Sequence, residues 1–424
     1  MSQRPTIGLG LAACIALLSS GAGAADGPLV EAQKLFDAAI QQRERGELDQ
    51  SIRLYQEILG QQPALSRARA ELALTYYQAL NFAAAREEAR MLLGEQSLPA
   101  NVRANLDLLI ERIDRESRPH RWQPFMQTGI GHDSNANVGP GADTVQAGGA
   151  LLTLLPGATR QADTFTQFSA GISHRYLAPQ TLGIGGRTAA FLWQSSASYF
   201  TQNYRSLTRF DLDVLSLASG PSLIVAGRAR ASLNAQYDQI SIGHTRLAIY
   251  SGVSPNLTLT LGRTELGFDA QVQQRRFTDI ANAGRNSRYQ SLGLAATQRL
   301  TGNLESVEFL VGARLFDENA DLARHGNRGS EIYLGAGWKP WQGGQVFART
   351  GLRKPRYKDV EPLFNEVRAD RETRTTIGSS HAFQSGWAQE FTLSLSASFT
   401  RNRSTVPIYE YHRDQLTVSF GRVF

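Results

Sequence analysis

The chain has 424 residues, of which 42% are hydrophobic, with one cysteine and a formal net charge of +6. After the first 24 residues no apolar run reaches the roughly 18 residues that a membrane-spanning helix needs, which excludes a helical bundle in a membrane. The composition does not exclude a transmembrane β-barrel, because the strands of a barrel alternate lipid-facing apolar residues with lumen-facing polar ones.

The first residues predict an export signal. Arg4 precedes the mostly apolar residues 7–18, and the small residues 22–24 offer a cleavage site. Residues 1–24 are therefore expected to be a signal peptide. A competing interpretation is a lipoprotein cleavage box at residues 11–14, with Cys14 as the lipidated residue. Because Cys14 is the only cysteine, the mature chain is expected to have no disulfide and no thiolate metal site.

Residues 25–118 have a helical pattern that repeats. Leu48, Ser51, Ile58, Leu59, Gly60 and Gln62 recur 34 positions later as Phe82, Ala85, Leu92, Leu93, Gly94 and Gln96. A 34-residue helix-turn-helix period is that of tetratricopeptide repeats, which present a concave groove to a peptide or protein. Second helices are expected to begin at Leu48 and Phe82, and residues 99–116 to cap the stack. Tyr55, Tyr76 and Tyr77 are the candidate groove residues; the alternative is a helical adaptor that only stabilises the rest.

Charge is distributed unevenly along the chain. Residues 25–119 hold 12 basic and 15 acidic residues, whereas residues 120–424 hold 31 basic and 23 acidic residues. The basic character of the second part fits a cationic lumen or loops that meet anionic lipopolysaccharide. A nucleic-acid-binding motif is absent from the sequence, so we expect no nucleic-acid partner.

Residues 119–424 alternate polar and apolar residues between turn residues, which predicts strands. We expect an α+β multidomain protein with an antiparallel transmembrane β-barrel of about 14 strands after the helical repeats. The strands are expected to begin near Trp122, Phe165, Arg187, Leu207, Leu223, Arg246, Leu257, Arg288, Leu304, Gly329, Gln345, Arg368, Trp387 and Ile408. Residues 409–424 form the predicted closing strand, with Tyr411, Phe420 and Phe424 as its closure and assembly signal.

Short and long connections are expected to alternate along the barrel. Residues 219–221, 254–256, 301–303, 342–344 and 384–386 are predicted tight turns, and residues 277–287, 317–328 and 356–367 are predicted long loops. The longest loop, residues 132–163, contains the apolar residues 151–156. This stretch either folds inward as a plug or lid, binds a partner, or extends a strand above the membrane.

Catalytic and cofactor motifs are absent from the sequence. Ser380 and His381 are the nearest nucleophile and base, but adjacent strand residues point to opposite faces, so we expect no enzyme activity and no cofactor. Asp133, Asn135 and Asn137 look like the start of a calcium loop. Val138 stands where that loop needs glycine, so the favoured interpretation is a turn built from Asx side chains rather than a metal site.

The chain resembles the surface lipoprotein assembly modifier family, outer-membrane components of type XI secretion. The residues that carry the resemblance are 122–131 leading into 133–137, then 368–370, 401–404, 409–413 and the terminal Phe424. The resemblance implies an outer-membrane barrel with a periplasmic repeat domain. It also implies export of client proteins, either surface lipoproteins or soluble haem- and metal-scavenging proteins, from the periplasm to the cell surface.

The partners that this resemblance implies are the client, a periplasmic chaperone, the barrel assembly machinery and outer-membrane lipid, with the chain itself a monomer. Five polar residues are expected to line the lumen as a polar path or to anchor an internal plug by ion pairs: Arg368, Asp370, Arg401, Asn402 and Arg413. Purely structural pairing of these charges is the alternative. Other functions left open are a polysaccharide-export porin, a passive diffusion porin and an adhesive barrel.

Overall fold

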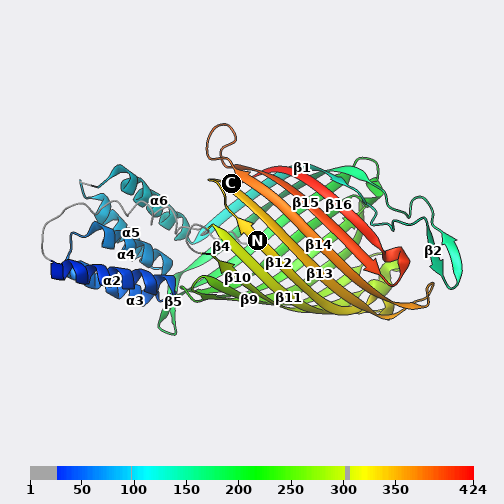
Figure 1. Cartoon of the computed structure of the whole chain (residues 1–424), viewed down its shortest axis with the longest axis horizontal. Coiled ribbons are helices and arrows are strands. Elements are labelled where there is room, and N and C mark those ends of the chain that lie inside the picture. Colours follow the sequence, from blue (N-terminus) through cyan, green and yellow to red (C-terminus); the bar gives the residue numbers. More distant parts are fainter. Residues whose placement is uncertain (1–25, 97, 301–305) are drawn as a thin grey trace.

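The protein is represented by a computed structural model that describes residues 26–96, 98–300 and 306–424. A helical domain lies at one end of a long β-barrel (Figure 1). The predicted signal peptide and the predicted turn at residues 301–303 lie outside the described residues. Among the described residues, no helix has the length and apolar character needed to cross a membrane.

Five helices form the helical domain: α2 (Asp26–Glu44), α3 (Leu48–Gln61), α4 (Ser66–Gln78), α5 (Phe82–Leu93) and α6 (Ala100–Glu116). Helices α3 and α5 begin at Leu48 and Phe82, as the 34-residue offset predicts, and α6 matches the predicted third stretch. Neighbouring helices pack through small residues, because Ala39, Ala85 and Ala89 have no exposed surface. Membership of the tetratricopeptide class stays a prediction.

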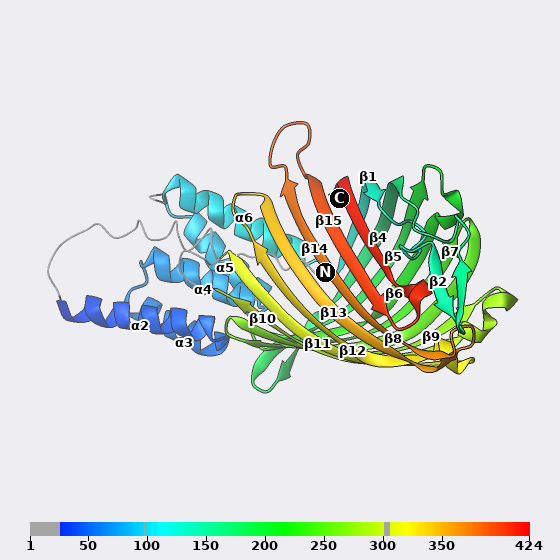
Figure 2. The same cartoon turned by 45° about the vertical axis from the view of Figure 1, so that its right-hand side comes forward.

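Fourteen antiparallel strands among the described residues close the barrel, which confirms the predicted architecture. They are β1 (His120–Asp133), β4 (Asp163–Ile184), β5 (Arg187–Tyr204), β6 (Leu212–Val225), β7 (Ala229–Ile242), β8 (Thr245–Leu261), β9 (Thr264–Phe277), β10 (Ser287–Arg299), β11 (Val307–Ala320), β12 (Asn327–Trp338), β13 (Gly344–Glu361), β14 (Glu366–Ala382), β15 (Phe391–Ser404) and β16 (Tyr411–Val423). Figure 2 shows β1 beside β16, where the last strand closes the cylinder.

The two faces of every strand differ in chemistry. Leu393, Leu395 and Phe399 on β15 share one parity with Leu416 and Val418 on β16, and all are exposed on the outer face. The opposite parity holds polar and charged side chains and faces the lumen. This alternation is what a barrel in lipid requires, because the outer surface meets hydrocarbon and the inner surface meets water.

Two predicted turns are wrong. Residues 219–221 lie inside β6 and residues 254–256 lie inside β8. At both places the ladder to the following strand skips Pro221 or Pro255, although both prolines pair on their other side. Proline has no N–H to donate, so each strand leaves two residues unpaired with the following strand and then continues. Residues 356–367 are also not a long loop, because β13 and β14 extend to Glu361 and Glu366.

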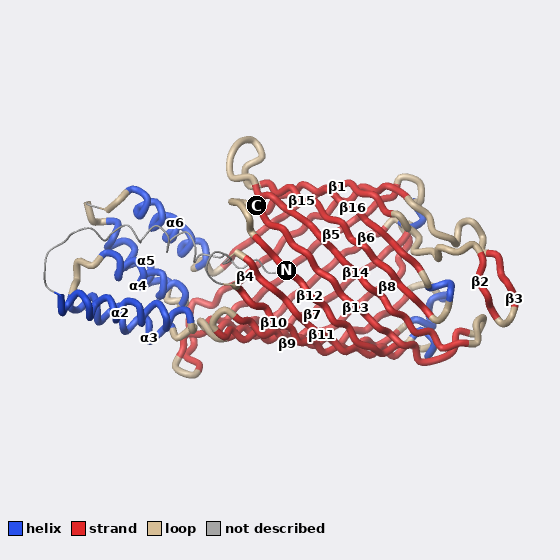
Figure 3. The backbone as a smooth tube through the Cα atoms, viewed as in Figure 1, coloured by secondary structure: helices blue, strands red, loops and turns tan. Residues whose placement is uncertain are grey.

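The barrel has two unlike ends. The helical end, beside α2–α6, has two-residue turns at 185–186 and 262–263 and a longer connection, residues 383–390. The loop end has the 3₁₀ helices η3 (Ile280–Arg285), η5 (Ala323–His325) and η6 (Pro407–Tyr409) (Figure 3). The first loop forms a hairpin of β2 (Thr144–Ala147) and β3 (Ala150–Thr153) that projects beyond the loop end. Residues 151–153 lie in β3 of this separate hairpin, so they neither plug the lumen nor extend a barrel strand, and Leu151 is 68% exposed.

Candidate transport path: the barrel lumen and its two ends

A buried carboxylate at the loop end joins the first and last strands. Asp133, the last residue of β1, has no exposed surface and accepts hydrogen bonds from the Arg413 guanidinium of β16, at 3.0 Å from Nε and 2.5 Å from Nη2. Gln415 Nε2 (3.0 Å) and the Tyr204 hydroxyl of β5 (2.8 Å) donate to the same oxygen. We call Asp133, Arg413, Tyr204 and Gln415 the closure network, since they connect three strands across the seam.

The residues after Asp133 form a compact turn of Asx side chains. The backbone N–H of Asn135 donates to Asp133 Oδ1 at 2.9 Å, and Asn135 Nδ2 donates to the carbonyl oxygens of Gly139 (2.8 Å) and His412 (3.0 Å). Asn137 Nδ2 donates to the Thr159 carbonyl at 2.6 Å. This geometry agrees with the interpretation of residues 133–137 as a turn that orders the first loop.

A second ionic cluster lies on β14 near the loop end. Arg368 donates to Asp370 through Nε (3.0 Å) and Nη2 (2.6 Å), and its guanidinium stacks on the rings of Tyr357 and Tyr409. Asn402 is buried on the neighbouring strand β15 and donates to the Tyr409 carbonyl at 2.7 Å. Buried charges in a barrel need such partners, so these groups hold the β13–β15 wall and the η6 loop together.

One residue predicted to line the lumen lies on the outer face of the barrel. Arg401 shares the parity of Phe399 and lies on the outer face, so the prediction that it lines the lumen is wrong. Continuing the apolar alternation of β15 by two residues beyond Phe399 would have shown this. Tyr411 of the predicted closure signal faces inward, where its hydroxyl donates to Glu372 at 2.9 Å.

The end of the closing strand is aromatic on its outer face. The ring of Phe420 stacks on Phe391 with centroids 4.8 Å apart, next to Trp387. The backbone N–H of Phe424 donates to the Pro124 carbonyl of β1 at 2.8 Å. These contacts tie the end of β16 to both neighbouring strands at the helical end; an assembly-signal role for Phe420 and Phe424 stays a prediction.

The helical domain contacts the barrel rim through the α2–α3 turn. Arg187, the first residue of β5, donates to the Gly46 carbonyl at 2.6 Å and forms an ion pair with Glu47. Leu48 packs on Ala226 in the β6–β7 turn. Sequence reasoning did not find this contact, because nothing local to Arg187 distinguishes it from other strand-end arginines.

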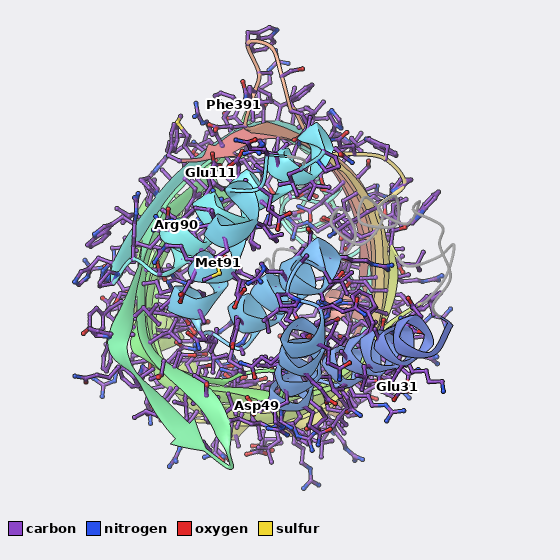
Figure 4. All side chains as sticks on the ribbon, turned by 90° about the vertical axis from the view of Figure 1, so that its left-hand side faces the viewer. Glu31, Asp49, Arg90, Met91, Glu111 and Phe391 are labelled. Atoms are coloured by element: carbon purple, nitrogen blue, oxygen red, sulfur yellow. The ribbon has the colours of Figure 1, made fainter. Side chains whose placement is uncertain are left out.

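Two further contacts extend the interface around the rim. Arg263, in the β8–β9 turn, pairs with Glu44 at 3.4 Å, and Arg175 of β4 donates to the Glu116 carbonyl at the end of α6 at 2.8 Å. Seen from the helical end, the helices lie across the outline of the barrel opening (Figure 4). The helical domain is therefore fixed at separate points of the rim and covers part of the mouth.

Two of the three predicted groove tyrosines belong to the helical core. Tyr55 has no exposed surface and Tyr77 is nearly buried, so the prediction that they line a groove is wrong. Burial raises the pKa of both phenols well above the usual range. Tyr76 is half-buried and accepts a hydrogen bond from Gln56 at 2.9 Å. Within the described residues, no group of three or more His, Cys, Asp and Glu side chains is arranged to hold a metal ion.

No family model matches the sequence. A surface lipoprotein assembly modifier of Pasteurella multocida strain Pm70 is 27% identical over 151 residues, which cover 32% of this chain and 29% of that protein. This chain is an outer-membrane barrel protein similar to the surface lipoprotein assembly modifiers. The match spans less than a third of the relative's length, so the relative's whole activity is not transferred by similarity alone.

Solved porins are among the structures to which this chain is similar. An anion-selective porin from Comamonas acidovorans aligns over 72% of this chain and 99% of its own, at 9% identity and a TM-score of 0.37. OprD from Pseudomonas aeruginosa aligns over 71% and 94%, at 10% identity and a TM-score of 0.34. At the coarse level, the chain is a closed β-barrel protein of the outer membrane.

Proposed function

We propose that this modifier-like protein exports specific client proteins, surface lipoproteins or soluble haem- or metal-scavenging proteins, from the periplasm to the cell surface. In this proposal the helical end faces the periplasm and the loop end faces outward. The observation that carries it is the helical domain held against the barrel rim by Arg187 and Arg263, together with the similarity to a surface lipoprotein assembly modifier. A diffusion porin has no need of such a domain.

The proposal requires no energy-coupling site in the chain. A client held unfolded in the periplasm enters the lumen from the helical domain and gains folding free energy outside. Folding at the surface then prevents its return, because a folded domain is wider than the path it came through. The helical domain would receive the client or its chaperone.

The charges of the lumen support protein export over polysaccharide export. A polysaccharide porin is expected to be lined densely by one sign of charge. Here opposite charges on β9 and β11 pair across the inner face of β10, as in Arg314 with Asp269 at 3.0 Å and Arg275 with Glu318 at 3.0 Å. Mixed, paired charges give a path with little preference for either sign.

The test is surface exposure of candidate clients. The chain is expressed with candidate surface lipoproteins in a heterologous Gram-negative host, and intact cells are treated with protease. Clients should become protease-accessible only when the chain is present, and equal exposure in its absence would contradict the proposal. A variant lacking residues 25–118 should keep a heat-modifiable barrel but lose client exposure. Unimpaired exposure with that variant would favour the adaptor interpretation.

A measurement of ion conductance distinguishes the proposed export function from that of a diffusion porin. Purified full-length chain in a planar bilayer should show small or transient currents, because the helical domain lies across the mouth. Large steady channels from the full-length chain would favour a passive porin instead.

A further inference from the structure

Two groups of strands in the lumen wall differ in charge, and β6–β8, with Arg230 and Asp238 on the inner face of β7, lie between them. Inward-facing positions on β9 to β14 hold most of the charged side chains of the wall. Inward-facing positions on β15, β16, β1, β4 and β5 hold none between Arg413 and Asp133 at the loop end and Arg121 and Arg175 at the helical end. Most of these positions are Ser, Thr, Gly or Gln. We call this second group the uncharged lane.

The charged side chains on β9 to β14 interact with one another and with neighbouring aromatic rings. Arg275 pairs with Glu318 and stacks on Tyr289, with 4.2 Å from guanidinium to ring centroid. Arg353 stacks on Phe316 at 4.4 Å, as Arg349 does on Tyr333. A guanidinium held in an ion pair or on a ring has already exchanged part of its water for protein contacts, so less of its attraction remains for a passing chain.

The lane offers short, neutral side chains. Ser394, Ser396 and Ser398 follow one another on the inner face of β15, and each is half-buried, as are Thr417 on β16 and Ser169 on β4. A hydroxyl can donate to or accept from any peptide group. Such a bond replaces one with water and has a net value of only about 0.5–1.5 kcal/mol, so no single contact holds a moving chain.

A fixed unpaired charge would act differently. It would attract or repel each charged residue of a passing segment, and in a partly desolvated lumen this interaction exceeds that of a neutral hydrogen bond. Passage through a pore needs contacts that are many and weak rather than few and strong. The lane meets this requirement for a polypeptide of any sequence, whereas a wall of free charges would not.

We propose that the uncharged lane is the path of an extended client polypeptide, and that the paired charges on β9 to β14 are structural. This rests on the proposed export function. The proposal has a consequence for the choice of client, because a lane without charged side chains does not distinguish one client sequence from another. Selection of clients therefore belongs to the helical end, before the chain enters the barrel.

Site-specific cross-linking tests the path. A photoreactive residue replaces Ser396 on the lane or Ala295 on β10, which is also small, half-buried and inward-facing near the middle of its strand. The probe is a lipoprotein whose exposure depends on the chain, fused at its C-terminus to a disulfide-bonded domain that arrests it in transit. Cross-links from position 396 should exceed those from position 295 several-fold.

An introduced charge gives a second, independent readout. Ser396→Arg should reduce client exposure several-fold, and Ala295→Arg, placed among existing charges, should leave it near the unmodified level. Heat-modifiability on gels checks that both variants form barrels. Equal cross-linking or equal loss of exposure from the two positions would overturn the lane while leaving export intact. If the unmodified chain exposes no client, the export function itself fails, which is a different result.

Discussion

The closure network makes a quantitative prediction for Asp133→Asn. The substitution preserves size but replaces one carboxylate oxygen by an NH₂ group, which then faces the Arg413 guanidinium, donor against donor. Asp133 is fully buried and accepts from three side chains in addition to the Asn135 N–H. Breaking a buried ion pair on one side leaves an uncompensated charge, so the free energy of unfolding should fall by about 3–5 kcal/mol.

The matched control is an exposed ion pair at the other end of β16, the strand that carries Arg413. Arg422 pairs with Glu390, and both side chains are substantially exposed. Glu390→Gln removes the same kind of charge but should cost at most about 1 kcal/mol, because water screens an exposed pair. Purified barrels are refolded into liposomes, and urea unfolding is followed by tryptophan fluorescence.

A double variant shows how much of the lost stability comes from burying the unpaired Arg413 charge and how much comes from altered packing. Asp133→Asn combined with Arg413→Met removes the uncompensated guanidinium, so it should recover part of the loss. The reasoning is refuted if Asp133→Asn costs no more than Glu390→Gln. Strict additivity of the two single losses would also refute it, since it would mean that Asp133 and Arg413 do not interact.

Three further predictions concern the helical domain. Arg187→Ala removes the Glu47 ion pair and the bond to the Gly46 carbonyl, so limited proteolysis should release the helices faster while the barrel stays heat-modifiable. Tyr55→Phe removes a buried hydroxyl that has no hydrogen-bond partner among the described residues. Thermal unfolding of the helices, followed by circular dichroism at 222 nm, should therefore occur at the same or a higher temperature. Ala85→Leu overfills a fully buried contact and should cost about 1–3 kcal/mol in the same measurement.

Much of the architecture could be predicted because it is repeated along the chain. The apolar alternation of residues 393–399 assigns a lipid face before any contact is known, and a 34-residue offset positions the starts of α3 and α5. The first depends on the two-residue period of a strand, and the second on a repeat of the helical pattern along the chain. The number of strands followed from counting such segments.

Errors occurred where a local signal has two meanings. Gly220-Pro221 and Ser254-Pro255 predict turns, yet they lie inside strands whose other edge is fully paired. Tyr55 and Tyr77 fit a ligand groove by residue type, but the packing of neighbouring helices buries them. Residue type alone does not say which side of a helix its neighbours cover.

The sequence by itself determined that helices precede a barrel of about 14 strands, and which residues face lipid where the apolar alternation is continuous, because those properties repeat over a few residues. Only the tertiary structure decided what the polar positions do. Asp133 and Arg413 are 280 residues apart and meet because the last strand pairs with the first. Closure of the cylinder likewise brings the neutral inner faces of β15, β16, β1, β4 and β5 together in one lane. No local stretch of sequence predicts that the first and last strands are neighbours.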